Sequence, residues 1–169
     1  LNSIGSNYIF SEKPINRFES TSDNSLANKN IKVNKEERLL RLREQVNSIE
    51  DCRLKDNSKM IILGDGNINS SIMLIGEAPG AEEDKMGLTF MGEVGDLLKK
   101  MLIAINIKKE NIYSTYAVNF RPPEDRKPTS AEIKRYSQFL KKHISIIEPK
   151  IIILMGSTAM ESMTGLNNK

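Results

Sequence analysis

Acidic side chains and one aromatic ring lie close together in a glycine-rich stretch between residues 76 and 95. Its first half, from Gly76 to Asp84, reads Gly-Glu-Ala-Pro-Gly-Ala-Glu-Glu-Asp, and its second half carries Phe90 among spaced glycines. A strand that turns through Pro and Gly into polar residues is how α/β enzymes build a site at the carboxyl ends of strands. Carboxylates there can bind a hard cation such as magnesium, although a lone acidic cluster is more often simply solvated. The whole stretch therefore predicts a functional site rather than a surface turn.

Short apolar runs predict the strands that would position this stretch. They are residues 60–63, 72–75, 112–118 and 151–155. The run at 72–75 comes directly before Gly76 and is nearly continuous in Ile, Met and Leu, which is typical of a strand buried in a parallel sheet. The stretch of interest therefore begins where a core strand ends.

Helical periodicity separates these runs. Apolar residues recur at helical spacing in residues 34–49, 96–105 and 129–147, and Thr129 with Glu132 forms a capping box at the start of the last segment. Strands that alternate with helices predict an α/β fold, a three-layer α/β/α sandwich around an open parallel sheet. The helix over 96–105 is expected to bury one face, made of Leu97, Leu98, Met101, Leu102 and Ile105.

The whole chain of 169 residues fits one domain behind a polar tail. Residues 1–33 are rich in Asn and Ser without apolar periodicity, which predicts disorder, and residues 34–169 form the expected domain. A single cysteine, Cys52, allows no internal disulfide and makes a cytoplasmic location the default expectation. No apolar run approaches the roughly 20 residues that span a bilayer, so no membrane partner is expected. The net charge of +3 is compatible with nucleic acid without establishing it.

The stretch over 76–95 resembles the first motif of the family-4 uracil-DNA glycosylases, the iron–sulfur type. That motif reads Gly-Glu-Ala/Gly-Pro-Gly-x-x-Glu-Asp, then x-Gly-x-Pro-Phe-x-Gly-x-x-Gly, and only Thr89 departs from it, where the family has Pro. The resemblance continues through Arg-Pro-Pro at 121–123 and the segment 148–156, and it covers residues 52–165. It implies the three-layer fold of that superfamily and hydrolysis of the N-glycosidic bond of uracil in DNA, a step of base excision repair. A monomer is expected.

The resemblance also implies roles for individual residues. An enzyme that removes a base flips the nucleotide out of the stack and holds the base by its edge while water attacks the sugar carbon. The catalytic roles fall to Glu77 and Glu83, and the ring that stacks on the base is Phe90. The motif residues implied to line the flipped nucleotide are Ala78, Pro79 and Gly80.

The Pro-rich loop after the 112–118 run carries the basic candidates. Arg121, Arg126 and Lys127 are candidates for contacts to DNA phosphates, which set affinity without sequence preference. An ordinary solvated basic loop is an equally good interpretation. Where the family has Asn, the loop has Asp125, which places a carboxylate near the expected phosphates.

Tyr116 stands where the family has the Asn that makes two hydrogen bonds to uracil. Tyrosine offers one hydroxyl instead of an adjacent donor and acceptor, and it adds bulk to a snug pocket. A pocket that reads a base by complementary polar groups loses discrimination steeply when one partner is removed, so we expect Tyr116 to exclude uracil. A tyrosine that reads a different base is the alternative.

The family's iron–sulfur cluster depends on four cysteines, of which this chain has only Cys52. Phe120 and Tyr136 stand at two of the other positions. One thiolate cannot hold a cluster that takes four, so neither this cofactor nor another metal is expected. We expect Phe120 and Tyr136 to fill the space as apolar packing.

The family's last motif, His-Pro-Ser/Ala on a further loop, has no counterpart before Lys169, so the carboxyl-terminal part of the fold is expected to be missing. The only histidine, His143, falls inside a predicted helix and is expected at its surface or boundary rather than in the site. Two hypotheses follow. The chain is a uracil-DNA glycosylase, or it is a truncated, catalytically inactive remnant that binds DNA at most weakly.

Overall fold

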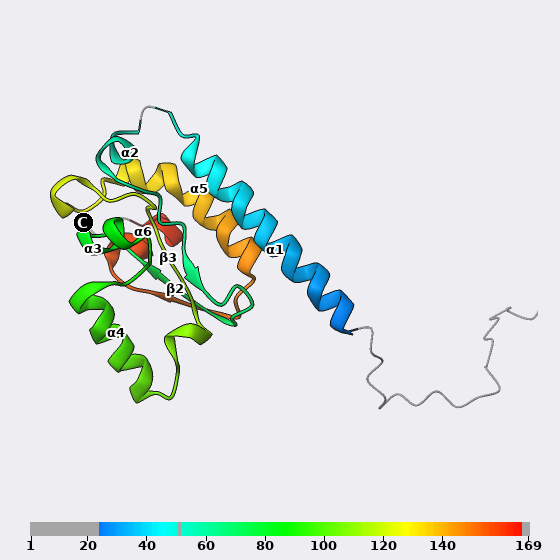
Figure 1. Ribbon diagram of the computed structural model, residues 1–169. Coiled ribbons are helices and arrows are strands. Elements are labelled where there is room, and N and C mark those ends of the chain that lie inside the picture. The colour runs from blue at the N-terminus through cyan, green and yellow to red at the C-terminus, as the bar shows by residue number, and fades with distance from the viewer. Residues whose placement is uncertain (1–23, 51, 167–169) are drawn as a thin grey trace, which may run out of the picture.

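In the part of the chain that the structure describes, four strands form one sheet, with helices packed against both of its faces (Figure 1). The computed structural model describes residues 24–50 and 52–166, with side chains described from residue 34 onward. The elements are α1 (Asn24–Asn47), α2 (Arg53–Asn57), β1 (Asp65–Gly66), β2 (Ile72–Gly76), α3 (Ala81–Met86), α4 (Gly92–Ala104), η1 (Lys109–Asn111), β3 (Tyr113–Tyr116), η2 (Pro123–Asp125), α5 (Ser130–Ile147), β4 (Ile151–Leu154) and α6 (Ser157–Thr164). No helix among these residues is long and apolar enough to cross a membrane.

The first helix begins before the position that the sequence pattern gave it. We expected disorder through residue 33 and a helix from residue 34, but α1 is already helical at Asn24. The earlier part of the expected tail, residues 1–23, lies outside the described residues.

The sheet has the strand order β1-β3-β2-β4. Strands β3, β2 and β4 are parallel, and Leu74 of β2 lies in register with Ser114 on one side and Ile153 on the other. The predicted parallel core is therefore confirmed, although β1 pairs antiparallel with β3 and makes the sheet mixed. The prediction of a strand at 60–63 is wrong. The backbone there makes one backbone-to-backbone hydrogen bond to the neighbouring segment, from Ile62 N–H to the Asn119 carbonyl after β3 at 2.9 Å.

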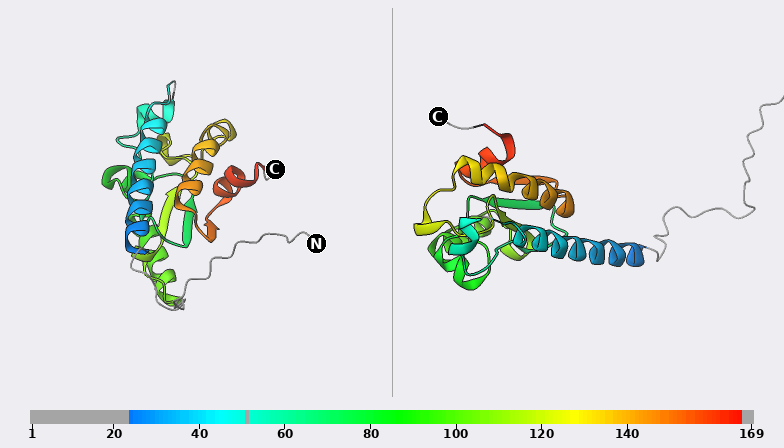
Figure 2. Two further views of the ribbon diagram at one scale, coloured as in Figure 1. Left: turned by 90° about the vertical axis from the view of Figure 1, so that its right-hand side faces the viewer. Right: turned by 90° about the horizontal axis from the view of Figure 1, so that it is seen from above.

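One face of the sheet is covered by α5 and α6, and α1 lies along α5 (Figures 1 and 2). Met73 and Ile75 of β2 join Tyr113 of β3 in a buried cluster with Leu140 and Ile147 of α5. Side chains on a strand alternate between faces, so Tyr116 at the end of β3 points to the opposite face. Tyr116, the candidate site residue of β3, is thus separated from α5 by the sheet.

The predicted start of α5 is confirmed. Glu132 Oε2 accepts a hydrogen bond from the Thr129 backbone N–H at 2.7 Å, and Thr129 Oγ1 accepts one from the Glu132 N–H at 3.3 Å. This reciprocal capping box satisfies two donors that a helix start would leave without a partner.

The opposite face of the sheet is covered by α4 (Figure 2). Leu98 and Leu102 of α4 are buried there, as predicted. Leu97, Met101 and Ile105 were expected on the same buried face, but all three are more than half exposed. The apolar arc of α4 is therefore wider than the part of it that the sheet covers.

Candidate functional site

The two loops predicted to form the site leave neighbouring strands at the same edge of the sheet. Gly76 ends β2 and lies in register with Tyr116, which ends β3. Backbone hydrogen bonds continue this pairing into the loops, from Ala117 N–H to the Gly76 carbonyl at 2.8 Å and from Val118 N–H to the Glu77 carbonyl at 3.2 Å. The motif stretch and the Pro-rich loop are thus held side by side at the carboxyl ends of the strands, where open α/β sheets bind ligands.

Glu83 joins the two halves of the motif. Its carboxylate is buried, with Oε2 accepting from Gly80 N–H at 3.0 Å and Oε1 from Met91 N–H at 2.9 Å. In the first contact the Glu83 side chain caps the start of α3, a short helix that the sequence pattern does not predict. The Tyr116 hydroxyl also lies 3.3 Å from Oε1 and donates to it. Both oxygens of this predicted catalytic residue therefore have partners inside the protein.

The loop that carries Phe90 is fixed by groups that the sequence did not single out. Asp65 of β1 accepts hydrogen bonds from the N–H and from the hydroxyl of Thr89, each at 2.7 Å, and Lys109 donates to the Thr89 carbonyl at 2.8 Å. Proline, which the related motif has at this position, has no N–H to donate. Thr89, unlike proline, can therefore donate its backbone N–H to the Asp65 carboxylate. These contacts link separate loops, so no local sequence pattern signals them.

Tyr116 fills the space between Phe90 and the end of β2. Its ring is 4% exposed and lies 5.2 Å from the Phe90 ring, with an interplanar angle of 38°. Its hydroxyl accepts the Phe90 backbone N–H at 2.8 Å. Burial raises the pKa of the Tyr116 phenol, so the hydroxyl keeps its proton and can donate to Glu83. Tyr116 is thus a satisfied core residue in the position where the related family binds the base.

Two glycines permit this close packing. A Cβ on Gly76 would lie 2.7 Å from the Tyr116 ring and 3.0 Å from the Phe90 ring. A Cβ on Gly95 would lie 1.8 Å from the Phe90 carbonyl oxygen, so α4 can begin this close to the Phe90 loop only with glycine there. The glycine spacing of the motif therefore reflects packing around Phe90.

Glu77 points away from that buried group, toward the start of α6. Its Oε1 accepts from Thr158 N–H at 2.9 Å and from the Ser157 hydroxyl at 3.3 Å. Burial alone would raise the pKa of the Glu77 carboxyl, but the hydrogen bonds from Thr158 and Ser157 and the nearby charge of Lys127 outweigh it and hold the pKa below its usual value. Gly156, at a φ of +101°, leaves room for this carboxylate, since a Cβ there would lie 2.5 Å from Glu77 Cδ.

A shallow cavity of about 130 Å³ opens between the motif turn and the Pro-rich loop. It contains one predicted catalytic residue, Glu77, and two of the three predicted DNA-contacting residues, Arg126 and Lys127. Its full lining is Glu77, Ala78, Pro79, Gly80, Pro122, Asp125, Arg126, Lys127 and Pro128. We call this cavity the cleft. Apart from Arg121, which lines neither, the predicted site residues therefore separate into the cleft and the buried group of Glu83, Phe90 and Tyr116.

The two arginines of the Pro-rich loop are paired with carboxylates of their own chain. Arg121 makes two hydrogen bonds to Asp125, at 2.7 and 2.8 Å, and Arg126 makes two to Glu132, at 2.7 and 2.9 Å. The bonds from Arg126 lower the pKa of Glu132 to about 2. A DNA phosphate would therefore have to compete with an internal carboxylate for each guanidinium group.

His143 does not lie at the surface or boundary of its helix, as we had expected. It is 2% exposed, and its Nε2 lies 2.9 Å from the Tyr113 hydroxyl on the face of the sheet covered by α5. Burial lowers the pKa of His143 to about 3, so the ring is neutral at physiological pH. The sheet separates it from Phe90 and Tyr116.

The residues that stand at the family's cluster positions form an apolar contact group. Cys52 Sγ lies 3.1 Å from the Tyr136 hydroxyl, and the Phe120 and Tyr136 rings meet edge to face at 6.3 Å. They belong to a buried cluster with Leu54 and Val118. In residues 24–50 and 52–166, no group of three or more His, Cys, Asp or Glu side chains could hold a metal ion. One thiol among aromatic and aliphatic carbon does not fit an iron–sulfur cluster.

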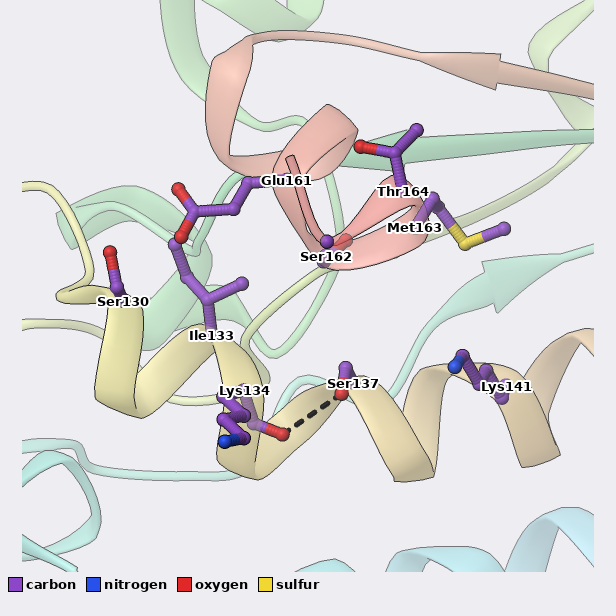
Figure 3. A pocket seen from close by; sticks show the side chains of 10 residues that line it. Ser130, Ile133, Lys134, Ser137, Lys141, Glu161, Ser162, Met163 and Thr164 are labelled. Carbon is purple, nitrogen blue, oxygen red and sulfur yellow. Dashed lines mark hydrogen bonds between the residues drawn. The ribbon is translucent and has the colours of Figure 1, made fainter. Parts of the chain in front are cut away.

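A larger cavity, of about 390 Å³, lies between α5 and α6 and away from the motif stretch (Figure 3). Three of its hydroxyls bond to carbonyls of their own helices: Ser137 Oγ to Lys134 at 2.9 Å, Ser162 Oγ to Ala159 at 2.7 Å and Thr164 Oγ1 to Met160 at 2.9 Å. Size alone therefore does not make it the site. The cleft is smaller, but it contains the charged motif residues.

Comparison with known proteins agrees with the motif. The sequence model of the uracil DNA glycosylase superfamily matches residues 63–168. The type-4 uracil-DNA glycosylase of Thermotoga maritima is 38% identical over 117 residues, which cover 69% of this chain and 61% of that protein. Those of Archaeoglobus fulgidus and Pyrobaculum aerophilum are 33% and 31% identical, over 72% and 76% of this chain and 61% and 65% of theirs. The chain thus spans less than two thirds of the length of these relatives.

Proposed function

The chain belongs to the uracil DNA glycosylase superfamily, and on this premise we propose that it engages uracil-containing DNA and hydrolyses the bond between uracil and its sugar. The observation that carries this proposal is the cleft. It holds the Glu77 carboxylate beside Lys127 and the Pro-rich loop, at the carboxyl ends of β2 and β3. An acid that faces a basic loop at this edge is suited to a reaction on a nucleotide whose phosphates lie against the loop.

The ionisation of Glu77 defines what it would do in the reaction. When the glycosidic bond breaks, the base leaves with the bonding electrons and positive charge develops on the sugar. A carboxylate with a lowered pKa is a weak base. It remains charged, however, and can stabilise that positive charge and orient the attacking water. We therefore assign Glu77 an electrostatic role, with Ser157 and Thr158 as the groups that position it.

Tyr116 favours a second candidate function, DNA binding without release of the base. Its ring packs against Phe90. Its hydroxyl accepts a hydrogen bond from the Phe90 N–H and donates one to Glu83. Tyr116 fills the space between the Phe90 ring and Gly76 at the end of β2. A base can stack on this side of Phe90 only if Tyr116 moves. In this alternative the cleft contacts the DNA backbone, and the buried group only supports the loops.

Single-turnover kinetics separate the two candidates. The purified chain, in excess over a labelled single-stranded oligonucleotide with one uracil, is assayed for free uracil and, in parallel, for binding at low and moderate salt. Release that falls at least tenfold in Glu77→Gln supports the glycosylase, because the amide keeps the size of the side chain and loses its charge. Glu124→Gln, an exposed acid outside the cleft lining, is the matched control.

Binding without release supports the second candidate instead. Failure of both binding and release, in a folded protein, contradicts both. Because the two arginines are paired internally, we propose that binding is weak and is lost with modest salt. We further propose that the isolated chain is monomeric, works in the cytoplasm and needs no iron–sulfur cluster, and the packing of Phe120 against Tyr136 supports the last point.

A further inference from the structure

The helices α1 and α5 run side by side (Figure 1), and a groove of about 230 Å³ lies between them. Its floor is apolar, because Leu42 of α1 and Ile146 of α5 line it and are buried. Three of the other lining residues are basic, namely Arg38, Arg41 and Lys142. None of the described residues that line the groove is acidic. We call it the α1–α5 groove.

Two of these cations are held in place by neutral groups. Arg38 Nη2 donates to the Ser145 carbonyl at 3.3 Å, and Lys142 Nζ donates to Gln45 Oε1 at 3.0 Å. Each bond joins α1 to α5, so it orients the side chain at the groove. Because the acceptors carry no charge, the bonds leave the positive charge of both side chains uncompensated.

The other arginines discussed above are in a different state. Arg41 is paired with Glu37, just as Arg121 and Arg126 of the Pro-rich loop are paired with carboxylates. An anion that binds such a cation must compete with its carboxylate. Arg38 and Lys142 form no ion pair among the residues whose side chains the structure describes, so an anion at the groove meets no such competitor there. The groove is therefore better prepared for an anion than the Pro-rich loop, where the sequence predicts the phosphate contacts.

Helix α5 connects the groove with the cleft. It begins directly after the Pro-rich loop, whose Lys127 lines the cleft, and Lys142 lies about 18 Å from its start at 1.5 Å per residue. Between Glu132 and Glu148 the sequence has four basic residues and no acidic one. The path from the cleft to the groove thus follows a helix whose charged side chains, past its first turn, are all positive.

A polyanion with regularly spaced charges fits this arrangement. One DNA strand carries a phosphate about every 3.4 Å, so about five phosphates span the distance from the start of α5 to Lys142. We propose that the α1–α5 groove binds the sugar–phosphate backbone of DNA, several nucleotides away from the nucleotide at the cleft, through Arg38 and Lys142. This rests on the proposed function only in taking DNA as the ligand, and it requires no release of the base.

DNA without uracil tests the groove separately from the reaction. Fluorescence anisotropy measures binding of labelled single-stranded oligothymidine to the full chain from low to moderate salt. Arg38→Gln and Lys142→Gln, which remove one charge each, should weaken binding at least threefold. Each should also reduce the slope of log K against log salt by about 0.7, the value for one phosphate contact on a single strand. Arg38→Lys keeps the charge and should bind nearly as tightly as the unaltered chain.

Arg43→Gln is the matched control. Arg43 is exposed on the same helix but does not line the groove, so its loss should change neither affinity nor slope. Strand length tests the link to the cleft. Affinity should rise between strands of about four and about twelve nucleotides, because only the longer ones can occupy the cleft and the groove together. Lys142→Gln should remove most of this rise.

Several outcomes overturn the proposal. They are no binding of DNA by the folded chain, binding that both groove substitutions leave unchanged, and equal weakening by Arg43→Gln, which would make net charge the cause. Tighter binding of polyglutamate than of oligothymidine also overturns it, since an acidic polypeptide would then be the favoured occupant. Groove-dependent binding without release of uracil contradicts the glycosylase alone. Release of uracil with no effect of the groove substitutions on binding contradicts the groove alone.

Discussion

The Tyr116 hydroxyl accepts the backbone N–H of Phe90 at 2.8 Å, and the two rings lie 5.2 Å apart. This contact ties the end of β3 to the loop that carries the predicted stacking residue. Phe90 has a φ of +50°, a left-handed conformation that is uncommon for a bulky residue. Tyr116 therefore both occupies the expected base position and holds the loop that would form its wall.

Removing only the hydroxyl should measure how far it stabilises that loop. In Tyr116→Phe the ring remains, but the buried Phe90 N–H loses its acceptor, which costs about 1–3 kcal/mol. Urea denaturation should show a lower midpoint with an unchanged slope. Unchanged stability in Tyr116→Phe would show that the contact contributes nothing.

Shortening the side chain should open the base position. Tyr116→Asn removes the ring from beside Phe90 and restores an adjacent donor and acceptor. We expect lower stability, by about 2–4 kcal/mol from the cavity left behind, together with tighter binding of a uracil-containing oligonucleotide than of its thymine counterpart. Equal binding of both by a folded Tyr116→Asn variant would contradict the role of Tyr116 as the obstruction.

The sequence predicted the neighbourhood of the site better than the orientation of its residues. Apolar runs and the motif placed Glu77 and the Pro-rich loop at one edge of a parallel sheet, because strand ends in such sheets meet there. Periodicity also placed Leu97 and His143 on helix faces. It could not tell whether the neighbouring element covers that face, so it buried the first, which is exposed, and exposed the second, which is buried.

The sequence pattern could not predict the contacts between separate segments of the chain, for a different reason. Asp65 and Thr89 meet only once β1 is paired with β3, and neither has a partner at a fixed sequence spacing. Likewise, a hydrogen bond joins Glu83 of α3 to Tyr116 at the end of β3. A motif gives the residue types that gather at a site. The tertiary fold decides which of them are bonded to each other and which face a ligand.

Restoring the family's proline at position 89 should destabilise this chain. Thr89→Pro removes both donors to the Asp65 carboxylate, which then remains partly buried without these partners. The expected loss is about 1–3 kcal/mol in the free energy of unfolding. The double variant Thr89→Pro with Asp65→Ala should recover part of it, since the carboxylate is gone. A loss that is the same in the double variant would point to backbone strain instead.

His143 should make stability depend on pH below neutrality. Burial lowers its pKa from the ordinary 6.5 to about 3, so between these values the unfolded chain binds a proton that the folded chain does not. The contribution of His143 to the free energy of unfolding is therefore fully present above about pH 6.5. It falls as the pH drops toward 3, by at most about 1.4 kcal/mol per pH unit. Denaturation series at several pH values should show this slope. His143→Gln, which can still bond to Tyr113, should flatten it between pH 6.5 and 5, because the chain has no other histidine.

The packing of Phe120 against Tyr136 predicts a protein that folds without iron. Phe120 is buried in the cluster that also contains Cys52, so its ring fills this part of the core instead of leaving a void. Protein purified without oxygen should contain no stoichiometric iron or sulfide, and a chelator should leave its melting temperature unchanged. Phe120→Ala should lower stability by about 3–5 kcal/mol, since a large side chain is removed from a packed core. Phe139→Ala, a partly buried neighbour of the same cluster, should cost clearly less. Bound iron at one cluster per chain, or melting that a chelator lowers, would show that these side chains do not replace the cofactor.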